Sequence, residues 1–192
     1  MGNVFKAVFS KYDTDKTTPH GNGDVGYEKA YEECFGNIRE HVKLIFEIGV
    51  NRGGSVRGWK EYFPTAQIVG IEVMPGSYFE EDRIAIEIGS GTDELFVPFL
   101  LTKYGHPDIV IDDGSHLSSD IKASFDLLFP NTLFCYVIED LVTQQSSFEG
   151  GMYINDGVPA TTIIHKAVDE ILLSPQSYRS IRIYHAISFF FK

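Results

Sequence analysis

Residues 108–116 are Asp108-Ile109-Val110-Ile111-Asp112-Asp113-Gly114-Ser115-His116, an apolar run followed at once by a turn with two acids and a histidine. The run Asp108–Ile111 is typical of a short strand buried on both faces of a sheet. A second apolar run, Leu133–Ile138, leads in the same way into the acidic pair Glu139-Asp140. Both clusters therefore follow predicted strands of an α/β sheet, and such sheets bind ligands at the carboxyl ends of their strands.

The sequence around these two runs alternates between strand and helix patterns. Further strands are predicted at Lys43–Val50, Gln67–Val73 and Arg83–Gly89, and helices at Ser55–Tyr62, Thr92–Tyr104, Ser118–Phe129 and about Ala160–Leu173. Two strand patterns within Ser180–Lys192 follow each other without a helix, which is typical of an antiparallel pair. The sequence predicts an α/β fold, namely a Rossmann-like, doubly wound, seven-stranded and mostly parallel sheet with an antiparallel C-terminal strand pair and helices on both faces.

The length of 192 residues predicts one domain, with residues 1–42 as a helical N-terminal cap and residues 43–192 as the Rossmann-like core. In the cap, a helix over Val4–Tyr12 and a polar loop over Asp13–Gly26 precede a second helix. That helix has aromatic residues at helical spacing, namely Tyr27, Tyr31 and Phe35. We expect the cap to cover the ligand cleft.

A second polar loop, Thr143–Pro159, directly follows the acidic pair and contains Gly150 and Gly151. Its position next to the predicted ligand cleft is compatible with a mobile lid. An ordinary surface connection explains the same composition equally well.

Composition and charge exclude several classes of protein. The net charge of −11 disfavours binding to nucleic-acid phosphates, and Lys and Arg form no local cluster. Cys34 and Cys135 are predicted to be reduced core thiols, which indicates a cytoplasmic protein. Residues 1–12 lack the features of a signal peptide, Lys6 does not fit a myristoylation motif, and no apolar run approaches membrane-spanning length. We therefore expect no membrane partner, and the sequence is compatible with a homo-oligomer.

A glycine-rich turn, Glu47-Ile48-Gly49-Val50-Asn51-Arg52-Gly53-Gly54-Ser55, joins the first predicted strand to a helix. Bare backbone in such a turn can approach a ligand closely, although a tight turn that needs positive φ explains the glycines too. The spacing differs from the dinucleotide fingerprint. Glu47 lies inside an apolar run and needs a partner there, which a cationic ligand could supply.

Glu72 ends the second predicted strand, where an acidic residue can bind both hydroxyls of a ribose. Together with the glycine-rich turn it favours a ligand that contains adenosine, with Gly89 and Ser90 beside the adenine. The alternative is that Glu72 is a solvated strand end. The predicted ligand-binding residues are Glu47, Gly49, Asn51, Gly53, Gly54, Ser55, Glu72, Gly89, Ser90 and Asp112.

The two acidic clusters predict a metal site. Three or four carboxylates that converge at one sheet edge repel one another unless a hard divalent cation neutralises them. An imidazole beside that cation, His116, is well placed to accept a proton. The alternative for His116 is a loop histidine that caps the helix beginning near Ser118.

Taken together, these motifs resemble those of a known family. Glu-x-Gly-x-x-x-Gly-Gly-Ser, the Gly-Ile-Glu after the second strand, Ile-Asp-Asp-Gly-Ser-His and Val-Ile-Glu-Asp-Leu are similar to motifs of class I S-adenosylmethionine-dependent methyltransferases. More narrowly, they resemble the metal-dependent sugar O-methyltransferases of mycinamicin biosynthesis. The resemblance covers roughly Lys11–Asp140 and includes Thr14-Asp15-Lys16 and His20, which resemble that family's N-terminal cap. The chain departs from the family pattern at residues 131–135 and 145–159.

The resemblance implies an O-methyltransferase that uses S-adenosylmethionine and Mg²⁺, with a sugar or glycan as acceptor. Ligands that offer only oxygen suit Mn²⁺ as well as Mg²⁺. It implies that Asp113, Glu139 and Asp140 hold the metal, that neighbouring sugar hydroxyls complete the metal shell, and that His116 is the general base. Asp113 is thus catalytic as well as a metal ligand. Asp112 lies one residue earlier, on the opposite face of the strand, and either supports the loop or faces the cofactor.

Three alternatives remain at the level of sequence. A catechol or caffeoyl-type O-methyltransferase shares the fold, cofactor and metal but acts on vicinal phenols. A nicotinamide oxidoreductase shares the sheet but needs the missing fingerprint. A nucleotide-binding module without catalysis predicts cofactor binding without metal.

Overall fold

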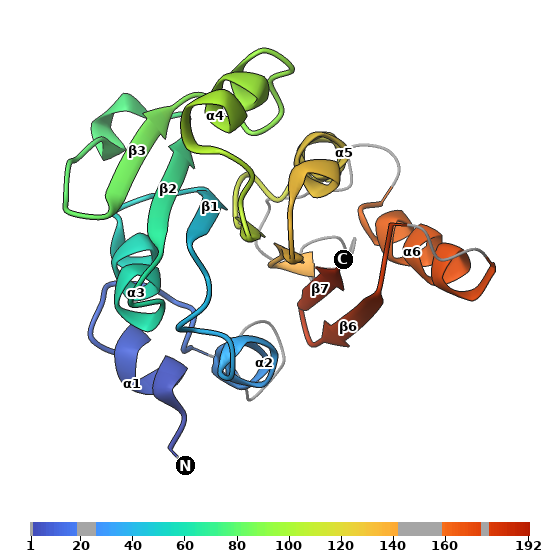
Figure 1. Cartoon of the computed structure of the whole chain (residues 1–192), viewed down its shortest axis with the longest axis horizontal. Coiled ribbons are helices and arrows are strands. Elements are labelled where there is room, and N and C mark those ends of the chain that lie inside the picture. Colours follow the sequence, from blue (N-terminus) through green and yellow to red (C-terminus); the bar gives the residue numbers. More distant parts are fainter. Residues whose placement is uncertain (1, 19–25, 142–158, 174–176) are drawn as a thin grey trace, which may run out of the picture.

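The computed structural model describes residues 2–18, 26–141, 159–173 and 177–192, which form a seven-stranded sheet with helices on both faces (Figure 1). The strand order is β3-β2-β1-β4-β5-β7-β6. The pairs among β1 to β5 are parallel, and β7 is antiparallel to both of its neighbours. The predicted fold class is confirmed. The strands are β1 (Leu44–Ile48), β2 (Gln67–Glu72), β3 (Ile84–Ile88), β4 (Ile109–Asp112), β5 (Cys135–Ile138), β6 (Ser180–Tyr184) and β7 (Ile187–Phe191).

The helices divide between the two faces of the sheet. On one face lie α1 (Val4–Phe9), α2 (Glu28–Phe35) and α3 (Gly54–Tyr62), whose aromatic residues, Phe5, Phe9, Tyr31, Trp59 and Tyr62 among them, form one hydrophobic core. On the other face lie α4 (Phe96–Tyr104), α5 (Ser118–Leu128) and α6 (Thr161–Leu173), which contribute to the second core. Short 3₁₀ turns are η1 (Pro75–Ser77) and η2 (Phe129–Asn131). The cap residues thus cover one face of the sheet.

The predicted helix over Thr92–Tyr104 begins later in the structure, at Phe96. The Asp93 carboxylate accepts hydrogen bonds from the backbone N–H groups of Leu95 and Phe96 at 2.7 and 3.0 Å. An acid that satisfies these otherwise unpaired donors marks the start of a helix, so the turn before Asp93 stays outside it.

Strand β1 lies between β2 and β4, and the strand order changes direction here. A crevice forms outside the carboxyl ends of strands at such a switch point. The glycine-rich turn follows β1, and the acidic motif at Asp112 to His116 follows β4. The fold therefore brings these two motifs together, although they lie far apart in the sequence.

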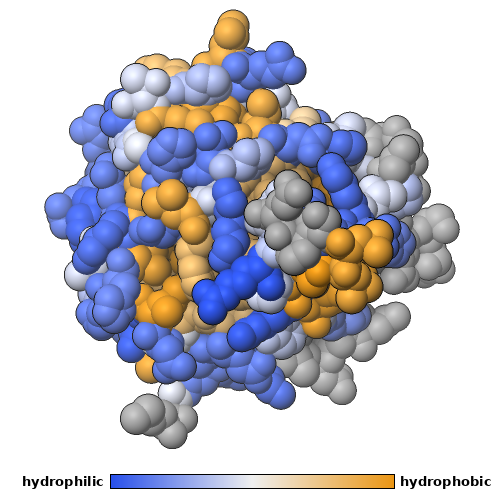
Figure 2. All heavy atoms as spheres, turned by 45° about the vertical axis from the view of Figure 1, so that its right-hand side comes forward, coloured by the Kyte–Doolittle hydropathy of each residue, from blue (hydrophilic) through white to orange (hydrophobic). Residues whose placement is uncertain are grey.

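Figure 2 shows mainly hydrophilic residues on the side of the molecule that carries α6, with apolar patches between them. In the part of the chain that the structure describes, no helix is both long and apolar enough to cross a bilayer. The predicted loop Thr143–Pro159, apart from Pro159, and His20 lie outside the described residues.

Candidate active site

A cavity of about 810 Å³ lies at the carboxyl ends of the central strands. The glycine-rich turn, the end of β2, the turn after β3, the motif after β4 and Asp140 all contribute to its wall. Residues 13–18 complete the wall, so part of the predicted cap borders this cavity; that the cap covers a ligand stays a prediction. The predicted site residues that line the cavity are Gly49, Asn51, Gly54, Ser55, Glu72, Gly89, Ser90, Asp112, Asp113, His116 and Asp140, and the cap residues are Asp13, Thr14, Asp15 and Thr18.

The glycine-rich turn packs directly against the acidic motif. Gly49 has a φ of 89°, and a Cβ atom there would lie 2.1 Å from the carbonyl oxygen of Asp113. Asn51 and Gly53 also have positive φ. The turn thus needs glycine for its backbone conformation, and it also lines the cavity, while the approach of a ligand to its backbone stays a prediction. Gly53 itself does not contribute to the cavity wall.

Glu72 connects the end of β2 to this turn. Its Oε2 accepts hydrogen bonds from the backbone N–H groups of Val50 and Asn51 at 3.1 and 3.0 Å, and its Oε1 accepts one from Met74 at 3.0 Å. Burial by itself raises the pKa of this carboxyl, but the backbone hydrogen bonds outweigh it and leave the pKa below its usual value. Glu72 is buried, so it is not a solvated strand end. Its carboxylate fixes the shape of the glycine-rich turn.

Glu47 is fully buried and does not line the cavity. Its carboxylate accepts hydrogen bonds from Trp59 Nε1 at 2.8 Å and Ser55 Oγ at 2.9 Å, and Lys16 Nζ lies 3.5 Å away. Burial raises the pKa of Glu47 to about 7, although these partners oppose the rise. The cationic partner expected for Glu47 is therefore a residue of the chain, Lys16, and not a ligand.

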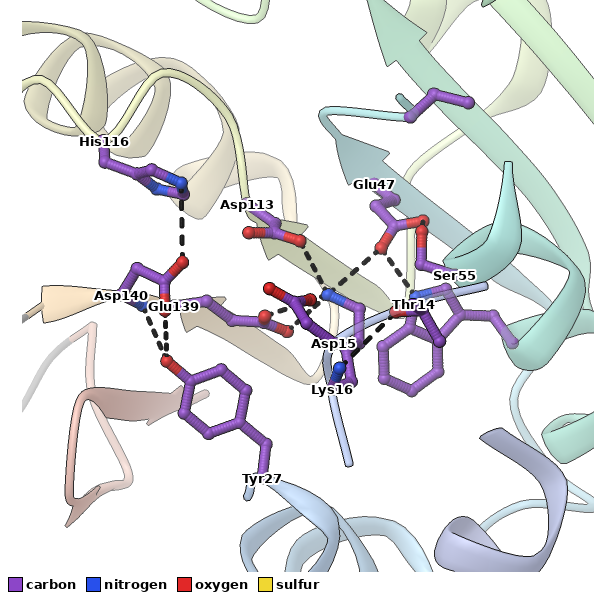
Figure 3. Close-up of polar contacts among 12 residues, drawn as sticks. Thr14, Asp15, Lys16, Tyr27, Glu47, Ser55, Asp113, His116, Glu139 and Asp140 are labelled. Atoms are coloured by element: carbon purple, nitrogen blue, oxygen red, sulfur yellow. Dashed lines mark hydrogen bonds and ion pairs between the residues drawn. The ribbon is translucent and has the colours of Figure 1, made fainter. Parts of the chain in front are cut away.

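Lys16 is the site residue whose role the sequence patterns did not predict. Its side chain is fully buried, and Nζ donates to Asp113 Oδ2 at 2.8 Å and to both oxygens of Glu139 at 2.9 Å (Figure 3). Burial lowers the pKa of the ammonium, but attraction to the surrounding carboxylates outweighs it and raises the pKa well above its usual value. Lys16 therefore carries a buried positive charge. The only sign in the sequence is its place in Thr14-Asp15-Lys16, which resembles a family motif.

His116, Asp140 and Asp113 come together at the cavity edge. The imidazole Nε2 of His116 lies 3.5 Å from Asp140 Oδ2, and one ligand atom from each of the three residues lies within 4.8 Å of the others. Both His116 and Asp140 have positive φ, 59° and 53°. Non-glycine residues in this conformation are often found at functional sites. The group is a candidate metal site.

Asp112 is a buried part of the cavity wall, and its carboxylate contacts Ser124 of α5. Its Oδ2 accepts hydrogen bonds from Ser124 Oγ at 2.5 Å and Tyr136 OH at 2.8 Å. Burial raises its pKa to about 6, against the effect of these hydrogen bonds. Of the two roles predicted for Asp112, these contacts favour support of the loop.

Comparisons with known proteins agree with the geometry. No family model matches the chain. It is 39% identical over 122 residues to mycinamicin VI 2''-O-methyltransferase of Micromonospora griseorubida, covering 59% of this chain and 31% of the relative. It is 33% identical over 162 residues to 8-demethyl-8-alpha-L-rhamnosyl tetracenomycin-C 2'-O-methyltransferase of Streptomyces olivaceus, covering 78% of this chain and 43% of the relative.

A solved structure shows the same similarity in three dimensions. It is the MycE methyltransferase of the mycinamycin biosynthetic pathway in complex with Mg, SAH and mycinamycin VI, with a TM-score of 0.81 and 30% identity, covering 97% of this chain and 53% of that one. This chain is a homologue of sugar O-methyltransferases. It spans less than half the length of the two curated homologues and about half of the solved one. A putative caffeoyl-CoA O-methyltransferase from Staphylococcus aureus, at 14% identity and a TM-score of 0.58, shares the fold.

The resemblance to sugar O-methyltransferases assigns Glu139 to the metal, and its surroundings differ from those of Asp113 and Asp140. Glu139 is buried, and both of its oxygens accept hydrogen bonds from Lys16. The Tyr31 hydroxyl donates to Oε1 as well. The assignment of Glu139 as a metal ligand stays a prediction. In the structure, Glu139 and Asp113 bind the same ammonium, that of Lys16.

Proposed function

We propose that this chain forms the catalytic region of an enzyme that transfers a methyl group from S-adenosylmethionine to a hydroxyl of a sugar, with Mg²⁺ or Mn²⁺ as cofactor. The supporting observation is the single cavity that joins the glycine-rich turn to the acid and histidine cluster. The homologues support the sugar as acceptor, since one of them is named as a 2'-O-methyltransferase of an alpha-L-rhamnosyl tetracenomycin. The net charge of −11 argues against a nucleic-acid acceptor.

The cavity suits the cofactor in size and lining. Its volume of about 810 Å³ lies within the usual range for small-molecule sites. Gly49, Asn51 and Gly54 of the glycine-rich turn line the cavity, and Glu72 ends β2 beside them. Gly89 and Ser90 line the cavity where the adenine is predicted. S-adenosylmethionine, when bound, supplies an already activated methyl group, so the chain's task is to align and deprotonate the acceptor.

The acidic cluster suits a hard divalent cation. Asp113 and Asp140 offer carboxylate oxygens at the cavity edge, while Glu139 does not line the cavity and binds the same ammonium as Asp113, that of Lys16. Oxygen ligands favour Mg²⁺ or Mn²⁺ over Zn²⁺. When bound, the ion lowers the pKa of an acceptor hydroxyl. We assign the metal to Asp113, Glu139 and Asp140.

His116 is then left for proton transfer. Its Nε2 faces Asp140 Oδ2 at 3.5 Å, and it lines the cavity in which the acceptor must lie. A neutral imidazole can accept a proton from an acceptor hydroxyl, which suits a general base. Asp140 orients the ring and stabilises the imidazolium that forms when the proton is taken up.

Calorimetry and a transfer assay test the proposal. S-adenosylhomocysteine should bind the chain, Mg²⁺ should bind in addition, and NAD should not. Methyl transfer to nucleotide-sugars, free deoxysugars and glycans, followed by mass spectrometry, should yield a product that EDTA suppresses. Transfer to vicinal phenols but to no sugar would indicate the catechol-type alternative. Cofactor binding without metal binding or transfer would indicate the non-catalytic module.

A further inference from the structure

One wall of the cavity is formed by residues 13–18, called here the wall segment. Asp13, Thr14, Asp15 and Thr18 of this segment line the cavity. The segment packs closely on the glycine-rich turn, because a Cβ atom at Gly54 would lie 1.9 Å from the carbonyl oxygen of Asp13. The shape of the cavity therefore depends on where the wall segment lies.

Lys16 is the one fully buried residue of the wall segment and is absent from the cavity lining. Its Nζ binds Asp113 and Glu139 at 2.8 and 2.9 Å and lies 3.5 Å from Glu47. These three acids lie in or just after β1, β4 and β5, so one ammonium contacts the ends of three neighbouring strands (Figure 3). Carboxylates gathered away from water repel one another strongly unless a cation lies among them.

The backbone of Lys16 makes a second connection. Its carbonyl oxygen accepts a hydrogen bond from the backbone N–H of Tyr27 at 3.0 Å, just before α2. The hydroxyls of Tyr27 and Tyr31 in turn donate to Asp140 and Glu139. The segment that forms the cavity wall and the residues that hold the acidic cluster are thus linked through Lys16.

We propose that Lys16 is a positioning residue, an internal cation that assembles Asp113 and Glu139 and holds the wall segment in place while no divalent ion is bound. The inference rests on the proposed function, because it takes the cavity as the cofactor site and the acids as the metal site. A lysine here offsets part of the negative charge of the cluster without occupying the cavity. The cofactor pocket is therefore complete before the metal arrives.

The test compares wild-type protein with Lys16→Met, which keeps the length of the side chain but removes its charge. In EDTA, calorimetry with S-adenosylhomocysteine should show at least tenfold weaker binding to the variant. Saturating MgCl₂ should recover a large part of this loss, since the divalent ion restores positive charge among the acids. The affinity of the wild-type protein for S-adenosylhomocysteine should change less than twofold when MgCl₂ replaces EDTA.

Two control variants separate positioning from general destabilisation. Lys11→Met removes an exposed ammonium that pairs with Glu61, and it should behave as wild type. Phe9→Leu disturbs the aromatic core beside Trp59 without contacting the acids, so MgCl₂ should not restore whatever affinity it loses. Rescue by Mg²⁺ in Lys16→Met alone is the specific signature of the internal cation.

Equal affinity of Lys16→Met and wild type in EDTA overturns the inference, as does a loss that MgCl₂ leaves unchanged. Wild-type protein that binds neither S-adenosylhomocysteine nor Mg²⁺ overturns the proposed function instead. If Lys16→Met does not fold, the double variant Lys16→Met/Glu139→Gln should fold, because it lacks one of the negative charges that Lys16 offsets. A double variant that stays unfolded while Glu139→Gln alone folds contradicts the inference.

Discussion

The phenolic oxygen of Tyr27 makes two hydrogen bonds with Asp140, donating to Oδ1 at 2.5 Å and accepting from the backbone N–H at 3.1 Å. Asp140 has a positive φ of 53°, and its other carboxylate oxygen faces His116. A residue of the cap thus fixes both the backbone and the side chain of a predicted metal ligand. Hydrogen bonds of this kind orient ligands and tune their affinity for metal.

Tyr27→Phe keeps the buried ring and removes only the hydroxyl. We expect affinity for Mn²⁺ to fall about tenfold, because Asp140 loses the donor that orients it. Calorimetric titration with MnCl₂ in the presence of S-adenosylhomocysteine measures the change. Tyr12→Phe is the matched control, since its hydroxyl binds the exposed Glu61. Equal Mn²⁺ affinities in both variants and wild type would show that Tyr27 does not orient the ligand.

His116→Ala tests the general base. Turnover should fall about 10²- to 10⁴-fold, the usual contribution of such a group. Affinities for S-adenosylhomocysteine and Mn²⁺ should stay within twofold of wild type, because His116 is assigned to the proton and not to the metal. Normal turnover would contradict the base assignment. A large loss of Mn²⁺ affinity would instead identify His116 as a ligand of the ion.

Asp113→Ala tests the metal assignment. The variant should lose its response to added MgCl₂, and its residual activity should be the same with and without EDTA. Asp126→Ala removes an exposed carboxylate of α5 that pairs with Lys122, and it should respond to Mg²⁺ as wild type does. Activity of Asp113→Ala that chelation still abolishes would place the ion on other residues.

The sequence predicted the fold because its signals are local. Apolar runs such as Asp108–Ile111 and Leu133–Ile138 are short, and turn residues or acids follow them, so strands and their carboxyl ends could be assigned. Parallel strands in a doubly wound sheet then place the glycine-rich turn and both acidic clusters at one edge. The cavity contains members of each predicted group, including Gly49, Asp113 and Asp140.

The partners of these residues could not be predicted in the same way. Lys16 lies in a polar loop without periodic pattern, and its contacts with Asp113 and Glu139 span 97 and 123 residues. Burial of a lysine depends on such tertiary contacts and leaves no local signal. Spacing placed Tyr27 and Tyr31 on one helical face, but the pattern does not tell which acids their hydroxyls reach. The sequence likewise shows that the carboxylate of Glu47 needs a cationic partner, but it does not show that this partner is Lys16.

Gly49→Ala tests the close packing of the two motifs. A methyl group there meets the Asp113 carbonyl oxygen at 2.1 Å, and φ of 89° is unfavourable for alanine. We expect a loss of about 2–4 kcal/mol in the free energy of unfolding, together with weaker S-adenosylhomocysteine binding. Urea unfolding measures the first effect. Gly76→Ala, where no heavy atom lies within 4 Å, should leave stability nearly unchanged. Equal stability of the two variants would rule out the predicted clash.

Asp112 gives the protein a predictable dependence on pH. Burial raises the pKa of Asp112 to about 6 from its ordinary value of 3.8. The folded state therefore holds this proton more tightly than the unfolded state does. Its stabilising effect is fully present below pH 3.8 and is lost as the pH rises through about 6.

Asp112→Asn removes this titration while keeping an oxygen that can accept from Ser124 and Tyr136. The difference in unfolding free energy, variant minus wild type, should become more positive by about 1 kcal/mol between pH 5 and pH 8. Any constant cost of the amide cancels in this comparison, because it is present at both pH values. Urea unfolding of both proteins at the two pH values measures it. A difference that stays constant, or becomes more negative at pH 8, would show that the pKa of Asp112 is not raised.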